Sequence, residues 1–390
     1  MRDEEGGMTN GKKNLETGQG KCVLPLPDSP CLIPHSYYLC HVKVDYLIVG
    51  QGIAGSVMAL TLEQRGKTVA ILNNPELSSS SRIAAGVYNP FNFRRSIPTW
   101  KAREACAFAE QFYVKAEEIT GEKFHRQKSI FRIFQSPEEK ELWKQYLLKP
   151  DRQFAENIYE HTMFGHVGTP FGYGMLNGGG VLRTEQFLEA VAKYFSNRGY
   201  YLEETGDHSL FAPTESEVIY DNRVHAKQVI FCEGHLAKSN PFFAEGIIAP
   251  THGEVLHVAI PKLEESSVVN SAVYLVPLKD DTYICGATFN PGRADEETTA
   301  TGREELVGKL KKDIDLDIRV VNHLAGVRPA GRDRKPVIGR SRNHRNLSIF
   351  NGFGSKAVLM SPFLAQMLAD HLENRGEILP EVNVSRFKVY

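Results

Sequence analysis

The stretch Val-Asp-Tyr-Leu-Ile-Val-Gly-Gln-Gly-Ile-Ala-Gly-Ser, residues 44–56, decides the fold class of this chain. Its first six residues form a mainly apolar run that is typical of a buried parallel strand. Three glycines follow at once in the spacing Gly-x-Gly-x-x-Gly. A helical pattern to Gln64 and a second apolar run, residues 67–72, come next. Strand, glycine turn, helix and strand together predict a unit that binds a dinucleotide.

Each glycine of this motif has a physical role. Gly50 permits the tight turn, Gly52 lets the backbone approach a pyrophosphate, and Gly55 lets the helix pack on the strand. The phosphates would lie at the helix N-terminus beside Ile53 and Ala54, where free N–H groups and the helix dipole favour an anion. We therefore expect all five residues to bind a cofactor. The alternative is a glycine turn that holds no ligand.

Length, charge and cysteine usage narrow the class of protein. The 390 residues predict either a large α/β domain with a second domain or two interleaved domains. A formal net charge of −1 gives no global field toward nucleic acid, although a local basic patch would not show in the total. Six cysteines without a C-x-x-C pair indicate reduced thiols, a cytoplasmic protein and no metal site. No apolar run approaches the about 18–20 residues of a membrane helix, so we expect no integral membrane segment.

Residues 1–41 show no chemical pattern. The first twenty are polar, and prolines interrupt the apolar pieces that follow. We predict a disordered extension, with a lid or a partner-binding tail as the functional alternative.

The position that usually holds a ribose-binding acid, about twenty residues past the glycines, carries Asn73. An amide oxygen accepts a hydroxyl hydrogen bond without a charge, so ribose binding should be weaker here or shared with other groups. A Ser-rich loop then leads into a small-residue segment. This loop is either a flexible linker or a wrapping for a phosphate and a flat group. Its candidate residues are Ser80, Ser81, Arg82, Ala84, Ala85 and Gly86.

This loop resembles a Ser-Ser-x-x-Ala-Ala-Gly segment of the FAD-dependent D-amino-acid oxidase and glycine oxidase superfamily, the DAO family. In that family the segment runs along the FAD pyrophosphate and ribityl chain, and the usual residue at the position of Asn73 is Glu. The resemblance implies an α/β protein: a Rossmann-like FAD-binding domain with a parallel sheet, and an antiparallel-sheet substrate domain. It also implies noncovalent FAD, since no matching cysteine for a covalent link is present. The implied FAD-binding domain is discontinuous, residues 42–123, 181–250 and 325–375, and the implied substrate domain covers residues 124–180 and 251–324.

Several further elements can be predicted. Helices are expected over 98–122, 137–148, 301–312 and 363–372, one starting near Thr184 as N-cap, and a hairpin over 274–288. Residues 165–180 include seven glycines and predict an irregular loop, with a substrate entrance as its functional interpretation. The run 224–231 resembles the family strand that ends in a small-residue turn beside the cofactor. This turn would use Gly234, although Glu233 replaces the usual small residue.

A second decisive stretch, residues 325–356, resembles the family segment that completes the cofactor site. Its glycine turn before a helix predicts contacts to FAD from Gly352, Phe353, Gly354, Ser355 and Lys356. A helix aimed at the flavin would stabilise the negative charge that builds up on reduction. In this family the arginine that matches Arg328 binds the substrate carboxylate, as two parallel hydrogen bonds would allow. The alternative is a structural Arg328 in a surface ion pair.

The arginines at 332, 334, 340, 342 and 345 crowd the same segment. They form either a solvated charged face or a basic rim for a phosphate-bearing substrate.

The resemblance implies oxidation of a small amine or amino acid, such as glycine, sarcosine or a D-amino acid. A hydride passes from the carbon beside nitrogen to flavin N5, and water hydrolyses the resulting imine. Arg328 would anchor the carboxylate, and Tyr274 is a candidate for a polar substrate contact. Oxygen or a quinone would be the electron acceptor.

Three alternatives remain open. Short segments, including Asn89-Pro90 and residues 352–356, also resemble the oxidoreductase half of a bifunctional tRNA-modifying family that removes a carboxymethyl group from a wobble uridine. The neutral net charge does not favour this tRNA partner. A nicotinamide-linked dehydrogenase would leave residues 325–372 unexplained. A non-enzymatic electron-transfer flavoprotein subunit would not need Arg328.

Overall fold

The structure, a computed structural model, describes residues 42–77, 79–150, 152–160, 166–263 and 266–387. The expected extension, residues 1–41, lies outside this part of the chain.

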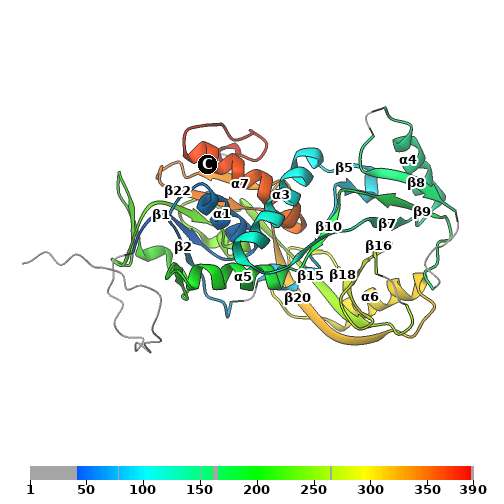
Figure 1. Ribbon diagram of the computed structural model, residues 1–390. Coiled ribbons are helices and arrows are strands. Elements are labelled where there is room, and N and C mark those ends of the chain that lie inside the picture. The colour runs from blue at the N-terminus through cyan, green and yellow to red at the C-terminus, as the bar shows by residue number, and fades with distance from the viewer. Residues whose placement is uncertain (1–41, 78, 151, 161–165, 264–265, 388–390) are drawn as a thin grey trace, which may run out of the picture. The chain divides into compact units, whose positions relative to one another are not determined.

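The predicted strand–turn–helix–strand unit is present. β1 (Val42–Val49) leads through the glycine turn into α1 (Ile53–Gln64), and β2 (Val69–Leu72) pairs with β1 in parallel. On its other side β1 pairs in parallel with β14 (Val224–Phe231), which pairs with β22 (Leu347–Asn351). Segments far apart in the sequence therefore end side by side at one edge of a parallel sheet (Figure 1).

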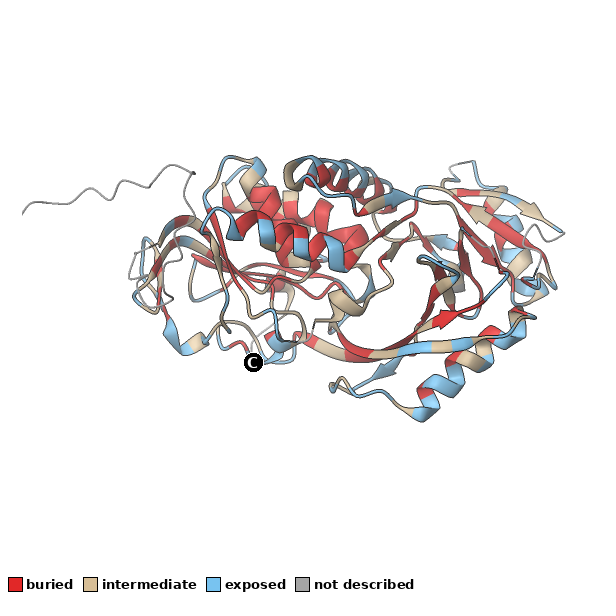
Figure 2. Ribbon diagram, turned by 60° about the horizontal axis from the view of Figure 1, so that its bottom comes forward, coloured by how far each residue is buried: buried red, intermediate tan, exposed pale blue. Residues whose placement is uncertain are grey.

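Helices cover one face of this first sheet. Tyr46 and Ile48 point into the core under the helices, while Leu47 and Val49 point into the core on the opposite face, as strand alternation requires. α7 packs against both α1 and α3 (Figure 1), and buried residues gather where the helices meet the sheet (Figure 2). The bounds are α3 Ala102–Thr120, α5 Thr184–Ser196, α7 Ala357–Leu372, β11 Tyr201–Leu202, β12 Phe211–Pro213, β13 Val218–Tyr220 and β21 Val337–Arg340.

A second, mainly antiparallel sheet is built around β15 (Ile248–Ala259) and β20 (Arg319–Gly331), which pair along most of their length. The predicted hairpin is also confirmed, as β17 (Tyr274–Pro277) and β18 (Thr282–Gly286). α6 packs on β15 and β18, and α4 on β8. The remaining bounds are β7 Ile130–Ile133, β8 Ala155–Tyr159, β9 Tyr173–Leu176, β16 Val268–Asn270, β19 Asn290–Pro291, α4 Pro137–Leu147 and α6 Ala300–Asp313.

Short elements connect the two sheets. β10 (Gly180–Leu182) pairs with β3 (Val87–Tyr88) and β6 (His125–Gln127). The others are α2 Ser80–Ile83, β4 Phe91–Asn92, β5 Ile97–Pro98 and the 3₁₀ turns Phe93–Arg95, His208–Leu210, Gly234–Ser239, Gly354–Lys356 and Val384–Arg386. The predicted fold class, α/β with a parallel and an antiparallel sheet, is confirmed. The assignment of segments to two domains stays a prediction.

The prediction of an irregular loop over the glycine-rich stretch 165–180 was wrong in part. Instead of a wholly irregular loop, it contains β9 and the start of β10. Gly174 lies in β9, and a Cβ at this position would lie 2.5 Å from the Trp143 ring. This glycine therefore makes room for a buried indole rather than breaking a strand.

The N-cap prediction for α5 was also wrong. Arg183 is the N-cap, and the Thr184 hydroxyl instead donates to the Ala84 carbonyl, 3.2 Å away. Thr184 thereby ties the start of α5 to the segment that follows α2.

α7 begins six residues before the predicted start at 363, with Pro362 inside it. A proline has no N–H for the carbonyl four residues earlier, which here belongs to Val358. The buried Tyr113 hydroxyl of α3 donates to that carbonyl at 2.8 Å. The interhelical hydrogen bond thus replaces the one that proline removes.

A buried ion pair holds the turn after β14. The Glu233 carboxylate is largely buried and lies 2.6 Å from His208 Nε2, and Asn240 Nδ2 donates to it at 2.8 Å. The hydrogen bond to Glu233 raises the pKa of His208 above its ordinary value. These contacts therefore fix the turn of Cys232, Glu233 and Gly234 against the 3₁₀ turn His208–Leu210.

The described cysteines Cys106, Cys232 and Cys285 are free and buried. Burial raises the pKa of the Cys106 thiol to about 12. Among the described helices, none has the length and apolar character needed to cross a membrane.

Replacing Tyr113 by Phe should lower the free energy of unfolding by about 1–3 kcal/mol, because the buried Val358 carbonyl loses its partner. In a Pro362→Ala background the restored backbone N–H can take that carbonyl, so the same replacement should cost clearly less. Urea unfolding of the two single variants and the double variant measures the coupling. Equal costs of Tyr113→Phe in both backgrounds would contradict the assignment.

The His208–Glu233 pair should make stability depend on pH. The pKa of His208 is raised in the fold, so its contribution is fully present below the unfolded value near 6.5 and is lost as pH rises through the folded value. Between about pH 6 and about pH 9 the wild type should lose more thermal stability than His208→Gln. Parallel melting curves for the two proteins would refute the role of this pair.

Candidate active site

Nearly all candidate residues from the sequence analysis line one cavity. Of the candidates, only Gly55 and Gly352 do not line it. A Cβ on Gly352 would lie 2.9 Å from a Val337 methyl group, so this glycine serves packing. The candidates that line the cavity are Gly50, Gly52, Ile53, Ala54, Asn73, Ser80, Ser81, Arg82, Ala84, Ala85, Gly86, Gly234, Tyr274, Arg328, Phe353, Gly354, Ser355 and Lys356.

Two glycines set how closely the backbone packs at the turn after β1. A Cβ on Gly55 would lie 1.9 Å from the Gly50 carbonyl oxygen, and one on Gly50 would lie 2.7 Å from the Cys232 carbonyl oxygen. Gly50 also has a φ of +93°, in the region that favours glycine. Only glycine at positions 50 and 55 therefore allows the turn, the start of α1 and the end of β14 to pack together.

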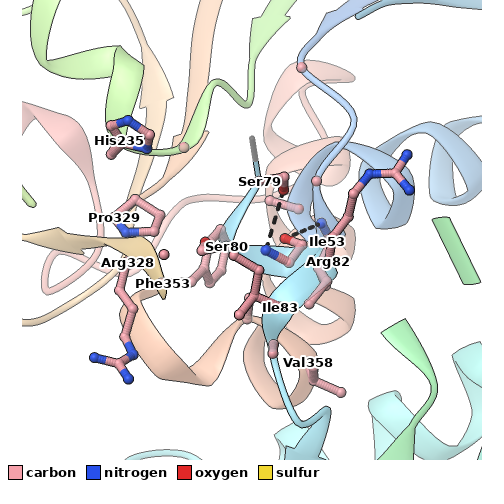
Figure 3. A pocket seen from close by; sticks show the side chains of 18 of the residues that line it. Ile53, Ser79, Ser80, Arg82, Ile83, His235, Arg328, Pro329, Phe353 and Val358 are labelled. Carbon is pink, nitrogen blue, oxygen red and sulfur yellow. Dashed lines mark hydrogen bonds between the residues drawn. The ribbon is translucent and has the colours of Figure 1, made fainter. Parts of the chain in front are cut away.

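The start of α1 offers an anion site. Its N-cap is Gly52, which has no side chain to satisfy the first N–H groups. The Ser81 hydroxyl accepts from the Ile53 N–H at 3.1 Å, and the Ser79 hydroxyl accepts from the Ser81 N–H at 3.3 Å (Figure 3). Ser81 keeps its own hydroxyl hydrogen for a ligand, and Arg82 adds a positive charge to the same wall.

Asn73 takes part in a closed set of hydrogen bonds that the sequence did not reveal. Its Oδ1 accepts from the Gln51 N–H at 2.9 Å, and its Nδ2 donates to the Tyr201 hydroxyl at 3.0 Å. That hydroxyl donates to Gln51 Oε1 at 3.0 Å. Gln51 is buried and lines the cavity. Asn73 therefore holds the glycine turn through these hydrogen bonds. Only one lone pair of its amide oxygen is left to accept a hydrogen bond from a ribose hydroxyl.

The turn after β14 lies along the opposite wall. Asn351 Nδ2 donates to the Gly234 carbonyl at 2.8 Å, which joins the ends of β14 and β22. His235 follows on this wall, in the 3₁₀ turn that packs on β20 (Figure 3). Burial lowers the pKa of His235, which favours its neutral form.

Arg328 of β20 presents a partly buried guanidinium to the cavity. Its Nη1 and Nη2 donate to the Thr288 carbonyl at 3.3 Å, and Nη1 also lies 3.4 Å from the His252 carbonyl. No carboxylate of the described residues forms an ion pair with it, so the surface ion pair considered from the sequence is not observed. Burial lowers the pKa of Arg328, although an arginine stays charged. The site thus holds a cation that lacks a counter-charge within the described residues.

Gly253 of β15 makes this placement possible. A Cβ built on Gly253 would lie 2.2 Å from both terminal nitrogens of Arg328. The guanidinium therefore lies flat over a strand at a position where only glycine leaves space. The sequence analysis missed Gly253 because its partner in this contact is distant in the chain.

Lys356 and Tyr274 provide two more polar groups. Lys356 Nζ donates to the Thr99 hydroxyl at 2.9 Å, and burial lowers the pKa of this lysine. The Tyr274 hydroxyl accepts a hydrogen bond from Asn89 Nδ2, and burial raises its pKa. Asn89 also lines the cavity, beside Tyr274. The sequence analysis named it only within the Asn89-Pro90 resemblance and assigned it no role.

Other sequence candidates lie elsewhere. No described residue of 166–179 lines the cavity, so a substrate entrance there finds no support in its lining. The arginines after residue 328 are not in its lining either. Arg340 donates to the carbonyls of Arg345 and Leu372, and Arg342 to those of Ser385 and Phe387. These two arginines fasten backbone at the end of α7 and near the C-terminus.

The donor set fits FAD. A helix start whose N-cap has no side chain, serine hydroxyls and Arg82 suit a pyrophosphate, and the glycines let the backbone segments around the cavity pack closely. The second glycine turn and the start of α7 complete the other end of the groove.

The comparisons agree with this geometry. The family model of FAD dependent oxidoreductases, DAO, matches residues 45–371. Glycine oxidase from Geobacillus kaustophilus is 24% identical over 85% of this chain and 94% of its own length. The tRNA 5-methylaminomethyl-2-thiouridine biosynthesis bifunctional protein MnmC from Marinobacter nauticus is 22% identical over 84% of this chain. The match spans only 55% of that relative.

Solved structures show the same fold. The crystal structure of glycine oxidase from Geobacillus kaustophilus has a TM-score of 0.75 at 21% identity, covering 90% of this chain and 99% of its own. An L-alpha-glycerophosphate oxidase from Mycoplasma pneumoniae with FAD bound has a TM-score of 0.66 at 16% identity, covering 88% and 98%. The family match includes both glycine turns and Arg328. A nicotinamide-linked dehydrogenase would not account for the second glycine turn or for Arg328. This chain belongs to the DAO family of FAD-dependent oxidoreductases and is an enzyme that uses FAD.

Proposed function

We propose that this enzyme oxidises an amine whose reacting carbon lies next to a carboxylate. The observation that carries the proposal is Arg328, a partly buried guanidinium that lines the cavity and lacks an ion-pair partner among the described residues. A planar fork of donors is suited to a carboxylate through two parallel hydrogen bonds. A small substrate such as glycine, sarcosine or a D-amino acid meets this requirement.

The residues divide the remaining work. Bound FAD supplies a noncovalently held acceptor for the hydride that leaves the carbon beside nitrogen. Arg328 fixes the carboxylate, so that the C–H has one orientation in the cavity. Tyr274, held by Asn89, offers a polar contact, and its raised pKa keeps the hydroxyl protonated and able to donate. The partly buried charge of Lys356 would favour the negative charge that builds up on reduction. The substrate amine must be neutral, and water then converts the imine into a carbonyl compound and an amine.

A second candidate is the oxidation of a carboxymethylamino group on a modified tRNA uridine. It needs the same neighbouring carboxylate and amine, so Arg328 would serve it equally. The similarity to MnmC proteins, at 22–24% identity in several bacteria, favours it. The two candidates differ in the size of what is attached to the amine, not in the chemistry.

Substrate identity can be tested by anaerobic bleaching of the bound flavin. Glycine, sarcosine, D-amino acids and carboxymethylaminomethyl-modified nucleosides would be compared. Reduction by at least one of these carboxylate-bearing amines is expected, and reduction by none would sink the proposal. Reoxidation by oxygen or by a soluble quinone would then identify the electron acceptor.

Replacing Arg328 by Ala should remove amine-dependent flavin reduction while FAD stays bound. Loss of two charge-assisted hydrogen bonds predicts a fall in kcat/KM of about 100-fold or more. Flavin absorbance measures retained cofactor, and stopped-flow measures reduction. Arg328→Lys, which keeps the charge but loses the fork, should recover only part of the rate. A normal reduction rate in Arg328→Ala would disprove the role.

Replacing Gly253 by Ala should raise KM about tenfold and leave kcat within a few-fold, because the methyl group displaces the guanidinium. A merely unfolded or cofactor-free variant would instead lose FAD absorbance, so both are measured. Ala249→Gly, in the same strand but outside the cavity lining, is the control. An unchanged KM in Gly253→Ala would contradict the contact.

A further inference from the structure

Glu254 of β15 is a buried carboxylate that the proposed oxidation does not use. It directly follows Gly253, the glycine over which the guanidinium of Arg328 lies. Successive side chains of a strand point to opposite faces, so the Glu254 side chain leaves the cavity behind and meets α6 on the other face of β15. A buried carboxylate needs polar partners to offset the loss of water.

Glu254 completes the cap at the start of α6. Thr299 is the N-cap of this helix, and its hydroxyl accepts from the Gly302 N–H at 2.9 Å. In a capping box a Glu or Gln at the position of Gly302 would accept from the N–H of the cap residue. Glu254 takes that role from β15: its Oε2 accepts from the Thr299 N–H and its Oε1 from the Thr299 hydroxyl, both at 2.8 Å.

Gly302 leaves the space that this carboxylate fills. A Cβ on Gly302 would lie 2.4 Å from Glu254 Oε1. On the other side of the carboxylate, His323 Nε2 of β20 lies 2.8 Å from Oε2. Burial by itself would raise the pKa of Glu254, but the hydrogen bonds from Thr299 and the nearby His323 outweigh it and lower that pKa. The carboxyl is therefore ionised at neutral pH, at the end of α6 where a negative charge is favoured.

The backbone of Glu254 joins this cap to the carbonyls that hold Arg328. The Glu254 N–H donates to the Thr288 hydroxyl at 2.8 Å, and the Thr288 N–H donates to the Glu254 carbonyl at 3.1 Å. The Thr288 carbonyl in turn accepts from both terminal nitrogens of Arg328. Thr288 is itself buried, so the direction of its carbonyl depends on where Glu254 is held.

The second carbonyl that faces Arg328 is held by the same segment. It belongs to His252, which is fully buried. His252 Nε2 donates to the Glu297 carbonyl at 3.0 Å, two residues before Thr299. Residues 297–299 therefore fasten both carbonyl-bearing parts of the site from behind the strand.

We propose that Glu254 is a positioning residue, which fixes the direction of Arg328 by holding the start of α6 against β15. The proposal rests on the proposed function for the binding of a substrate carboxylate by Arg328. Among the described residues, no hydrogen bond or ion pair joins Glu254 directly to Arg328, so its effect passes through Thr288 and the backbone of β15. If these carbonyls shift, the guanidinium loses the alignment that two parallel hydrogen bonds to a carboxylate require.

Carboxylate binding is measured apart from oxidation, with the FAD-loaded protein. Acetate carries the carboxylate of glycine without its amine, so it can bind but cannot be oxidised at a carbon beside nitrogen. The change in flavin absorbance on titration gives its Kd. Glu254→Gln keeps the size of the side chain but replaces one accepting oxygen by a donor. The Kd of acetate and the KM of the oxidised amine should both rise about tenfold, while kcat changes little and FAD stays bound.

Gly302→Ala and Gly308→Ala form a matched pair within α6. Both variants gain the higher helix propensity of alanine. The new methyl group at 302 meets the Glu254 carboxylate, whereas no described atom lies within 4 Å of a Cβ at 308. Gly302→Ala should therefore raise the Kd of acetate about fivefold, and Gly308→Ala should leave it unchanged. Gly302→Ala also tests the proposal if Glu254→Gln fails to fold.

Glu117→Gln controls for the loss of a buried carboxylate as such. Glu117 of α3 is also buried, and its carboxylate accepts from the N–H groups of Phe124 and His125 at 2.8 Å. It is not part of the cavity lining. This variant should lose stability in urea unfolding, as Glu254→Gln does, but should bind acetate like the wild type.

The proposal is overturned if either folded, FAD-loaded variant, Glu254→Gln or Gly302→Ala, binds acetate with wild-type affinity. It is equally overturned if Gly308→Ala or Glu117→Gln weakens acetate binding as much. Acetate binding that requires Arg328 but not Glu254 refutes only this inference. Failure of acetate to bind the wild type, or binding that survives Arg328→Ala, refutes the carboxylate role of Arg328, and the proposed function then falls together with this inference.

Discussion

The backbone contact between the glycine turn and the end of β14 is the constraint on which the site depends. Gly55 packs on the Gly50 carbonyl, and Gly50 packs on that of Cys232, at separations where a Cβ cannot fit. This contact brings the start of α1 to the edge where the parallel strands end, so its N–H groups face the groove. The Ser81 hydroxyl, which lies outside α1, then accepts a hydrogen bond from the Ile53 N–H. A larger residue at either glycine would separate the groups that must act on one pyrophosphate.

Periodicity and turn chemistry were enough to predict most elements of the fold, because those signals are local. The β1–α1–β2 unit and the β17–β18 hairpin follow from residues that are neighbours in the sequence. Two failures have non-local causes. Gly174 suggested a break in regular structure until Trp143, thirty-one positions earlier, was seen to need its space. Pro362 suggested a helix start, but Tyr113 supplies the missing hydrogen bond from another helix.

The candidate site shows the same division between local and non-local signals. Nearly all the residues chosen from motifs line one cavity, because motif spacing encodes how a strand end meets a helix start. The supporting residues could not be chosen in this way. Gln51 matters through Asn73 and Tyr201, and Gly253 matters through Arg328. A residue whose role is to leave space, or to hold another residue, has no chemical signature of its own in a single sequence.

The way in which the guanidinium of Arg328 is held decides whether it can orient a substrate. Arg328 is partly buried and lies over Gly253, with its donors turned to the Thr288 and His252 carbonyls. These dipoles offset part of the cost of burying its charge, and a substrate carboxylate would offset the rest. Its position changes little when an anion arrives, so it can orient the reacting carbon. The alignment of the C–H bond with the flavin therefore depends on Arg328.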